Sequence, residues 1–149
     1  MSEDGRWFMN AYLNILLPQS ESAAGVSLIE HHMLDGFFVP PHVHHNEDET
    51  FYVLEGTVRF MVEGAISEIG AGGSLNVAGG KVHAFKIVSP RVRFLTITNG
   101  TFEDMVRAAS TPAERPEIPP QLPFTEAEQQ KLAELCNKNG IEFVGPPID

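Results

Sequence analysis

Hydrophobic residues in this chain come in short runs that Gly, Pro and polar turn residues interrupt every few positions. The runs are rich in β-branched and aromatic side chains, so they predict strands rather than helices. The predicted strands are one or two within residues 7–17, and then residues 26–34, 42–44, 50–54, 57–62, 65–69, 74–78, 82–88 and 92–98. Short strands at this spacing indicate a sandwich or a barrel.

A tight-turn dipeptide, Glu55-Gly56, lies between two of these runs. Because such dipeptides connect antiparallel neighbours, we expect residues 50–54 and 57–62 to form a hairpin. The 13 glycines and 11 prolines are typical of many short strands joined by turns. A length of 149 residues suits one domain with its own hydrophobic core.

The chain changes character after residue 100. Residues 101–109 predict a short helix that is capped by its first residue. Five prolines within residues 111–124 predict an extended arm without regular structure. Thr125 and Glu128 form a capping box at the start of a second helix, and residues 141–149 predict a loop-like tail.

Composition narrows the classes of partner. A formal net charge of −10 without a long basic run disfavours nucleic acid and anionic membrane surfaces. Asn10 and Asn14 interrupt the early apolar stretch, and no run approaches the about 18 apolar residues of a membrane span, so we expect a cytoplasmic protein. Cys136 is the sole cysteine, which allows no internal disulfide and suits a small core residue of the last helix.

One stretch concentrates side chains that bind metals. His42 and His44 are two residues apart, so they point to the same face of a strand. The polar residues 45–48 predict a turn, after which Glu49 returns beside His44 if the flanking strands pair antiparallel. Two imidazoles and a carboxylate then converge as in a metal site. His83, which opens a later strand, is the expected fourth ligand.

Other polar residues near this stretch are weaker candidates. His45 follows a ligand directly, so its side chain points the opposite way and is expected at the surface. His31 and His32 are adjacent and face opposite sides, so one of them could face the cavity. These three histidines are the alternatives for the fourth ligand. Glu47 and Asp48 are expected to form a solvated turn.

The spacing of these residues resembles the first cupin motif. The motif runs Gly36, five residues, His42, one residue, His44, four residues, Glu49, six residues and Gly56. A second stretch is similar to the second cupin motif. It holds Gly72, Gly80 and His83, with Ala78 in place of the usual Pro and Ile87 in place of the usual Asn. Together the two motifs span about a third of the chain.

Within the cupins, the chain most resembles small single-domain proteins that are similar to quercetin dioxygenases. Residues 40–44, residues 47–56 and the proline-rich arm with its terminal helix and residues 140–147 carry this resemblance. It implies an all-β fold, the cupin double-stranded β-helix or jelly-roll barrel, with a short helix and a C-terminal helix. We expect residues 1–110 to form the barrel with its N-terminal strands, and residues 111–149 to pack on the same domain.

The resemblance also implies a metal centre. It assigns the ligands His42, His44, Glu49 and His83 to one divalent transition metal per chain. Imidazoles and a carboxylate suit iron, nickel, manganese, copper or zinc, and four protein ligands leave positions open for a small-molecule substrate. In dioxygenases of this kind the glutamate can also act as a base, so Glu49 is the expected catalytic residue.

Four apolar residues share strand parity with the expected ligands. Phe51 and Val53 follow Glu49 at even spacing, and Phe85 and Ile87 follow the histidine of the second motif. They are expected to line the substrate pocket near the metal, although plain core packing explains the same pattern.

These residues suggest first a dioxygenase-type oxidoreductase that acts on a small aromatic or enol-containing molecule. The alternatives are a non-redox metal cupin, such as an isomerase, decarboxylase or lyase, and a metal-containing binding protein without turnover. We also expect a homodimer, because residues 7–17 are apolar enough to pair with a neighbouring sheet and the arm could wrap around a barrel.

Overall fold

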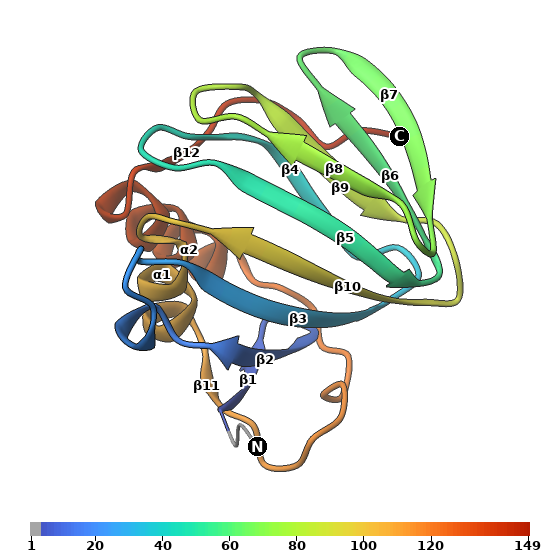
Figure 1. Ribbon diagram of the computed structural model, residues 1–149. Helices are drawn as coiled ribbons and strands as arrows, with labels where there is room; N and C mark the ends of the chain where they lie inside the picture. The colour runs from blue at the N-terminus through green and yellow to red at the C-terminus, as the bar shows by residue number, and fades with distance from the viewer. Residues whose placement is uncertain (1–3) are drawn as a thin grey trace.

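The structure, a computed structural model, describes residues 4–149. The first three residues of the predicted barrel segment, 1–3, lie outside the described residues. Two antiparallel sheets curve around a shared core, as Figure 1 shows. The first sheet has, in spatial order, β11 (Thr111–Pro112), β1 (Gly5–Phe8), β2 (Ala11–Leu17), β3 (Ser27–Leu34), β10 (Arg91–Thr98), β5 (Glu49–Glu55) and β8 (Ser74–Val77). The second sheet has β12 (Ile141–Phe143), β4 (Phe38–His44), β9 (His83–Ile87), β6 (Thr57–Val62) and β7 (Ala65–Gly70).

Alternation of buried and less buried residues places the core between the sheets. In β3 every second residue is buried, and β10 alternates in the same way. Phe51, Phe60 and Phe94 are among the largest fully buried side chains, and their rings meet edge to face or tilted. The expectation of an all-β jelly-roll fold with two helices is confirmed.

Two of the expected strand pairings are wrong. β5 pairs with β10 and β8, whereas β6 pairs with β9 and β7, so Glu55-Gly56 joins two sheets and does not close a hairpin. β4 pairs with β9 and β12, so the turn before Glu49 also crosses between sheets. Gly56 has φ +83°, and a Cβ there would lie 2.3 Å from the Arg91 backbone oxygen, so this crossover requires glycine.

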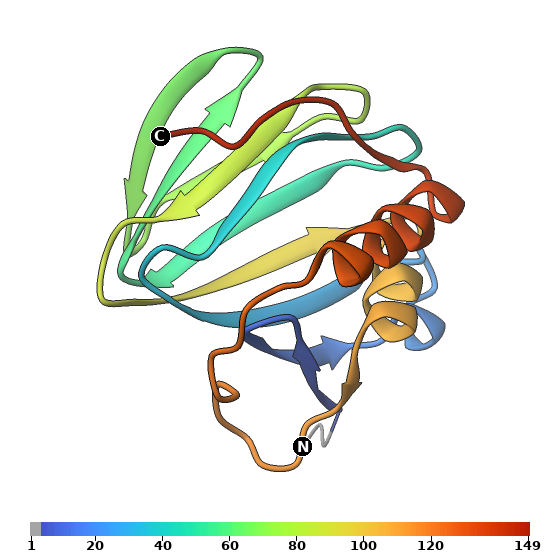
Figure 2. The same ribbon diagram turned by 180° about the vertical axis from the view of Figure 1, so that it is seen from behind.

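Both helices lie at one end of the sheets (Figure 2): α1 (Phe102–Ala109) and α2 (Glu126–Lys138). The capping box of α2 is confirmed, because the Glu128 backbone N–H donates to the Thr125 hydroxyl. The expected side-chain cap of α1 is wrong, since the Thr101 hydroxyl donates instead to the Asn139 backbone oxygen at 2.6 Å. A short 3₁₀ helix, η1 (Gln19–Glu21), follows β2.

The C-terminal segment is more regular than expected. The two-residue strand β11 pairs with β1 at the start of the arm, and β12 pairs with β4 where a loop was expected. The rest of the arm is tied to the turn between β1 and β2 by Asn10, whose side chain bonds both the backbone N–H and the backbone oxygen of Leu122. β1 pairs with β2, and β2 pairs with β3; the homodimer stays a prediction. No helix among residues 4–149 is long and apolar enough to cross a membrane.

Candidate metal centre

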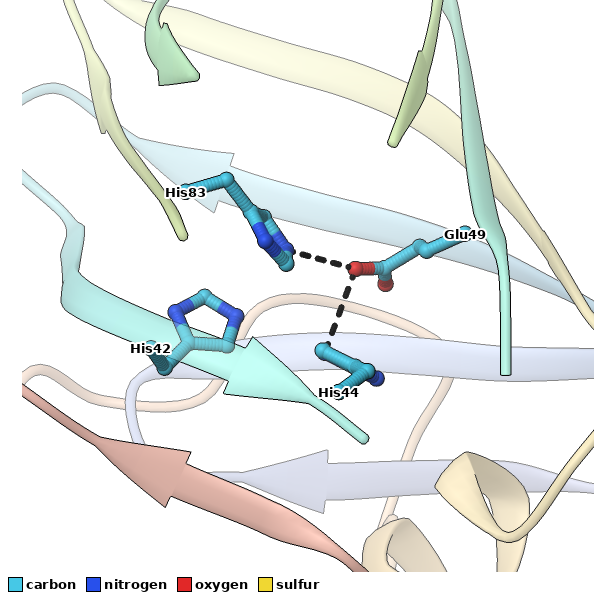
Figure 3. A group of neighbouring side chains, drawn as sticks. All are labelled: His42, His44, Glu49 and His83. Atoms are coloured by element: carbon cyan, nitrogen blue, oxygen red, sulfur yellow. Dashed lines mark hydrogen bonds and ion pairs between the residues drawn. The ribbon is translucent and has the colours of Figure 1, made fainter. Parts of the chain in front are cut away.

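Four buried side chains from three strands converge between the sheets. His42 and His44 come from β4, His83 begins β9 beside it, and Glu49 begins β5 on the opposite sheet (Figure 3). His42 and His83 are direct partners in the register of β4 and β9, with ring centroids 4.1 Å apart. One potential ligand atom from each of the four residues lies within 4.8 Å of the others. The four residues that the two sequence motifs single out therefore lie in one cluster.

The distances within the cluster fit a shared cation. Glu49 Oε1 lies 3.1 Å from His83 Nε2 and 3.4 Å from His44 Nε2 (Figure 3). Nitrogen and oxygen ligands at about 2.1 Å from one ion, at angles of roughly 90–110°, lie roughly 3.0–3.4 Å from each other. A carboxylate oxygen and a neutral imidazole nitrogen both offer lone pairs, so a proton or a metal ion between them stabilises this arrangement. The donor set therefore fits a divalent metal.

The outer nitrogen of each clustered histidine has a protein partner. His42 Nδ1 lies 2.8 Å from the Pro40 backbone oxygen, and His83 Nδ1 lies 3.3 Å from the Lys81 backbone oxygen. His44 Nδ1 lies 2.9 Å from a carboxylate oxygen of Glu47. Because each acceptor takes a proton from Nδ1, a neutral ring presents its Nε2 lone pair to the cluster, as in histidine-bound metal sites.

Glu47 is buried, and the expectation that it lies in a solvated turn is wrong for this residue. One carboxylate oxygen bonds His44, and the other accepts the backbone N–H of Phe102 at 3.2 Å, at the start of α1. Its partner in the turn, Asp48, is exposed as expected and accepts the Gly79 backbone N–H. The three-residue spacing between His44 and Glu47 is the feature of the sequence that could have predicted this contact.

Burial and charge separate the protonation states of the cluster. Burial, with the imidazoles of His83 and His44, lowers the pKa of His42 to about 3. Burial also acts to lower the pKa of His44, but the carboxylates of Glu49 and Glu47 outweigh it and raise that pKa. Burial acts to raise the pKa of Glu49, yet the surrounding imidazoles lower it to about 2. The cluster thus stabilises the charged carboxylate of Glu49, the neutral ring of His42 and the protonated ring of His44.

The remaining candidate histidines occupy different environments. His45 is exposed and lies 3.0 Å from a carboxylate oxygen of Glu142, as the strand parity predicts. His32 is half-buried and bonds Glu30 on its own strand. His31 faces inward and is buried, so of the adjacent pair it is the one that reaches the cavity.

An apolar cavity of about 80 Å³ opens beside the cluster. Three of the four clustered residues line it, together with His31, Thr96 and a wall of aromatic and aliphatic side chains. Among residues 4–149 no Lys or Arg lines this cavity. Of the four predicted pocket residues, Phe51 and Phe85 line it, whereas Val53 and Ile87 are fully buried in the core and do not. Contact between Phe51 or Phe85 and a substrate stays a prediction.

A comparison with protein families agrees with the fold and with the cluster of His42, His44, Glu49 and His83. Residues 30–98, which contain all four clustered residues, match the family described as "Cupin domain". Residues 30–98 are therefore similar to a cupin domain, and the jelly-roll fold agrees with that similarity. No curated protein sequence matches the chain.

Solved structures with a similar fold belong to differently named proteins. KdgF from Halomonas sp. has a TM-score of 0.58 and 17% identity over 64% of this chain and 84% of that chain. A predicted oxalate decarboxylase from Thermotoga maritima has a TM-score of 0.57 and 22% identity over 60% and 79% of the two chains. The Cnp3 cupin domain of Schizosaccharomyces pombe has a TM-score of 0.54 and 18% identity over 66% and 72%. At such identities the similarity shows the fold alone.

Proposed function

We propose that this chain is a metal-dependent cupin enzyme, a dioxygenase-type oxidoreductase that acts on a small aromatic or enol-containing molecule. The observation that carries the proposal is the position of the cluster, with His42, His44 and Glu49 lining a mostly apolar cavity. The resemblance of the chain to small cupins similar to quercetin dioxygenases supports the same substrate class.

The proposed metal ligands are His42, His44, Glu49 and His83. A bound divalent ion would supply a Lewis acid that lowers the pKa of a substrate hydroxyl and, for a redox-active metal, an electron relay to oxygen. The backbone and carboxylate partners of the three Nδ1 atoms hold the imidazoles in place.

The cavity lining favours an uncharged substrate or one with a single acidic hydroxyl. Phe51, Phe85 and Phe94 give the walls flat apolar faces on which an aromatic ring can pack. No Lys or Arg from residues 4–149 lines the walls, so the second charge of a dicarboxylate would enter without a cationic partner. The similarity in fold to a predicted oxalate decarboxylase therefore does not direct us to a dicarboxylate substrate.

Glu49 is the proposed base. It is the one carboxylate among the described residues that line the cavity. It is ionised at neutral pH, and it would accept the proton of a substrate hydroxyl whose pKa a bound divalent ion would lower. The apolar walls keep bulk water away from the proton that moves.

The test loads metal-free protein separately with Fe(II), Ni(II), Mn(II) or Zn(II) and offers a panel of flavonols and catechols. Oxygen uptake is measured with an electrode and products by mass spectrometry, in air and without oxygen. We expect uptake with at least one redox-active metal, none with Zn(II), and none with a His83→Ala variant. Metal content of every sample is measured by elemental analysis.

Other outcomes identify the alternative functions. Product that forms equally well without oxygen would replace the dioxygenase proposal with an isomerase, decarboxylase or lyase. Tight binding of panel members with no product under either condition would indicate a metal-containing binding protein. Full activity in metal-free protein would overturn every version in which the metal takes part.

A further inference from the structure

His31 is a further buried histidine in the cavity of the metal centre. It lies in β3, where alternate residues are buried between the sheets, and only 4% of its surface is exposed. Its neighbour His32 points the other way and bonds Glu30. The inward position of His31 therefore follows from strand register.

Two contacts fix the His31 ring. Its Nε2 lies 2.8 Å from the hydroxyl oxygen of Thr96, which is itself buried. The Phe94 ring stacks on it with centroids 4.6 Å apart and planes inclined by 12°. With its rotamer held in this way, Nδ1 is left buried and without a hydrogen-bond partner among residues 4–149.

This arrangement reverses that of the clustered histidines. In His42, His44 and His83 the protein occupies Nδ1 and leaves Nε2 facing the centre. In His31 the protein occupies Nε2, and buried Nδ1 has no partner within residues 4–149. A buried polar atom without a partner costs free energy that folded proteins rarely leave uncompensated, so a partner from outside the chain is the natural explanation.

The chemistry of the ring defines that partner. Burial lowers the pKa of His31 to about 4, so the ring is neutral near pH 7. The Thr96 hydroxyl can donate to Nε2 or accept from it, which leaves Nδ1 as a donor in the first case and an acceptor in the second. A hydroxyl group matches both cases, because it donates and accepts.

We propose that Nδ1 of His31 is a second binding point for the substrate, where it hydrogen-bonds a hydroxyl group apart from the atoms that face the metal centre. The inference rests on the proposed function and narrows its substrate class. The substrate is then an aromatic or enol compound with at least three oxygens, two for the metal and one for His31.

The test measures ligand binding to Zn(II)-loaded protein by calorimetry without oxygen, so that no turnover occurs. Two matched pairs of probes share a chelating pair of hydroxyls and differ by one hydroxyl or methyl group. They are pyrogallol with 3-methylcatechol, and 1,2,4-benzenetriol with 4-methylcatechol. We expect wild-type protein to bind the hydroxyl member of one pair roughly 3- to 10-fold more tightly than its methyl partner.

Variants of His31 separate the two ring nitrogens. His31→Gln can retain a polar atom near Thr96 but not at the position of Nδ1, so the preference is expected to disappear. His31→Asn places a polar atom near Nδ1 and is expected to keep much of it. The control His32→Phe, on the outward face of the same strand, is expected to leave the preference unchanged. Elemental analysis shows whether each variant carries the metal.

Three results would overturn the inference. Equal binding of both members of each pair by wild-type protein would remove the second binding point and leave the proposed function intact. An equal loss of affinity for both members in the Gln and Asn variants would show that His31 only supports the cavity wall. Wild-type protein that carries Zn(II) but binds none of the four probes would overturn the inference and the proposed substrate class together.

Discussion

Two sides of the metal centre hold their histidines by different means. On the local side, His42 and His83 each bond a backbone carbonyl two residues earlier in the chain, at Pro40 and Lys81. Such contacts require only the conformation of the strand that carries the histidine. They are made with the main chain, so no side-chain substitution at the acceptor removes them.

On the remote side, His44 depends on a side chain and on a distant element. Glu47 bonds its ring, and the same carboxylate accepts the first backbone N–H of α1, 55 residues further along the chain. Gly100 lies against this carboxylate, and a Cβ there would be 2.6 Å from the Glu47 Cβ. The remote side therefore forms only when the helix and the crossover between sheets are both in place, and one substitution can disturb it.

Loss of a ligand on the local side should have the largest effect. His83→Ala is expected to weaken metal binding by more than about 100-fold, since even residues that only orient ligands contribute about 10- to 100-fold. Competition with a coloured chelator measures the affinity, and elemental analysis gives the stoichiometry. His45→Ala removes an exposed imidazole and serves as the matched control. Unchanged stoichiometry in His83→Ala would redirect the assignment to His31, the other buried histidine that lines the cavity.

The remote side should respond to a single orienting residue. Glu47→Ala is expected to weaken metal binding about 10- to 100-fold, because the His44 ring loses its partner and the start of α1 loses an acceptor. Glu47→Gln keeps an oxygen that can accept from His44 and should recover part of the loss. Asp48→Ala, in the same turn but exposed, is the control. Equal affinities for the Glu47 and Asp48 variants would contradict the orienting role.

The pH dependence of metal-free protein should distinguish the two sides. The pKa of His42 is lowered from 6.5 to about 3. Between these pH values the unfolded chain binds a proton at His42 and the folded chain does not, so the free energy of unfolding falls as pH drops. Glu49 has its pKa lowered from 4.5 to about 2, so its contribution is present above pH 4.5 and is lost as pH falls toward 2. His44 has a raised pKa, so its contribution is present below 6.5 and is lost as pH rises through the raised value.

The net expectation is a fall of more than about 1 kcal/mol in the free energy of unfolding between pH 7 and pH 4. Urea unfolding at a series of pH values measures it, and NMR of labelled histidines assigns the protonation states. The His44 ring should stay charged to a higher pH than the His42 ring. The comparison between the sides would be wrong if both rings titrated together in wild-type and Glu47→Gln protein.

Local periodicity made the local side predictable from sequence. The spacing of His42 and His44 in a strand, and the place of His83 at the start of another, depend on a two-residue repeat that sequence displays directly. The same repeat correctly predicted that Val53 and Ile87 point inward. It could not show that the cavity ends before them, because the extent of a cavity depends on packing from both sheets.

The remote side could not be predicted from sequence, because it depends on contacts between residues far apart in the chain. The dipeptide Glu55-Gly56 has the same composition whether it closes a hairpin or carries the chain to the other sheet, and only packing of the whole barrel decides. Glu47 is likewise an ordinary polar turn residue until the start of α1 arrives beside it. Thr101 shows the same limit, since its hydroxyl bonds Asn139 from the end of α2 and not its own helix.

The smallest expected effect gives the sharpest test of the difference. Lys81 supports His83 through its backbone oxygen, and its side chain is exposed. Lys81→Ala should therefore change metal affinity by less than about twofold, as is usual for surface substitutions. The same chelator competition, run beside Glu47→Ala, measures both orienting residues under one set of conditions. A loss in Lys81→Ala as large as that in Glu47→Ala would mean that the side chain of Lys81 matters too, and the division into a main-chain side and a side-chain side would fail.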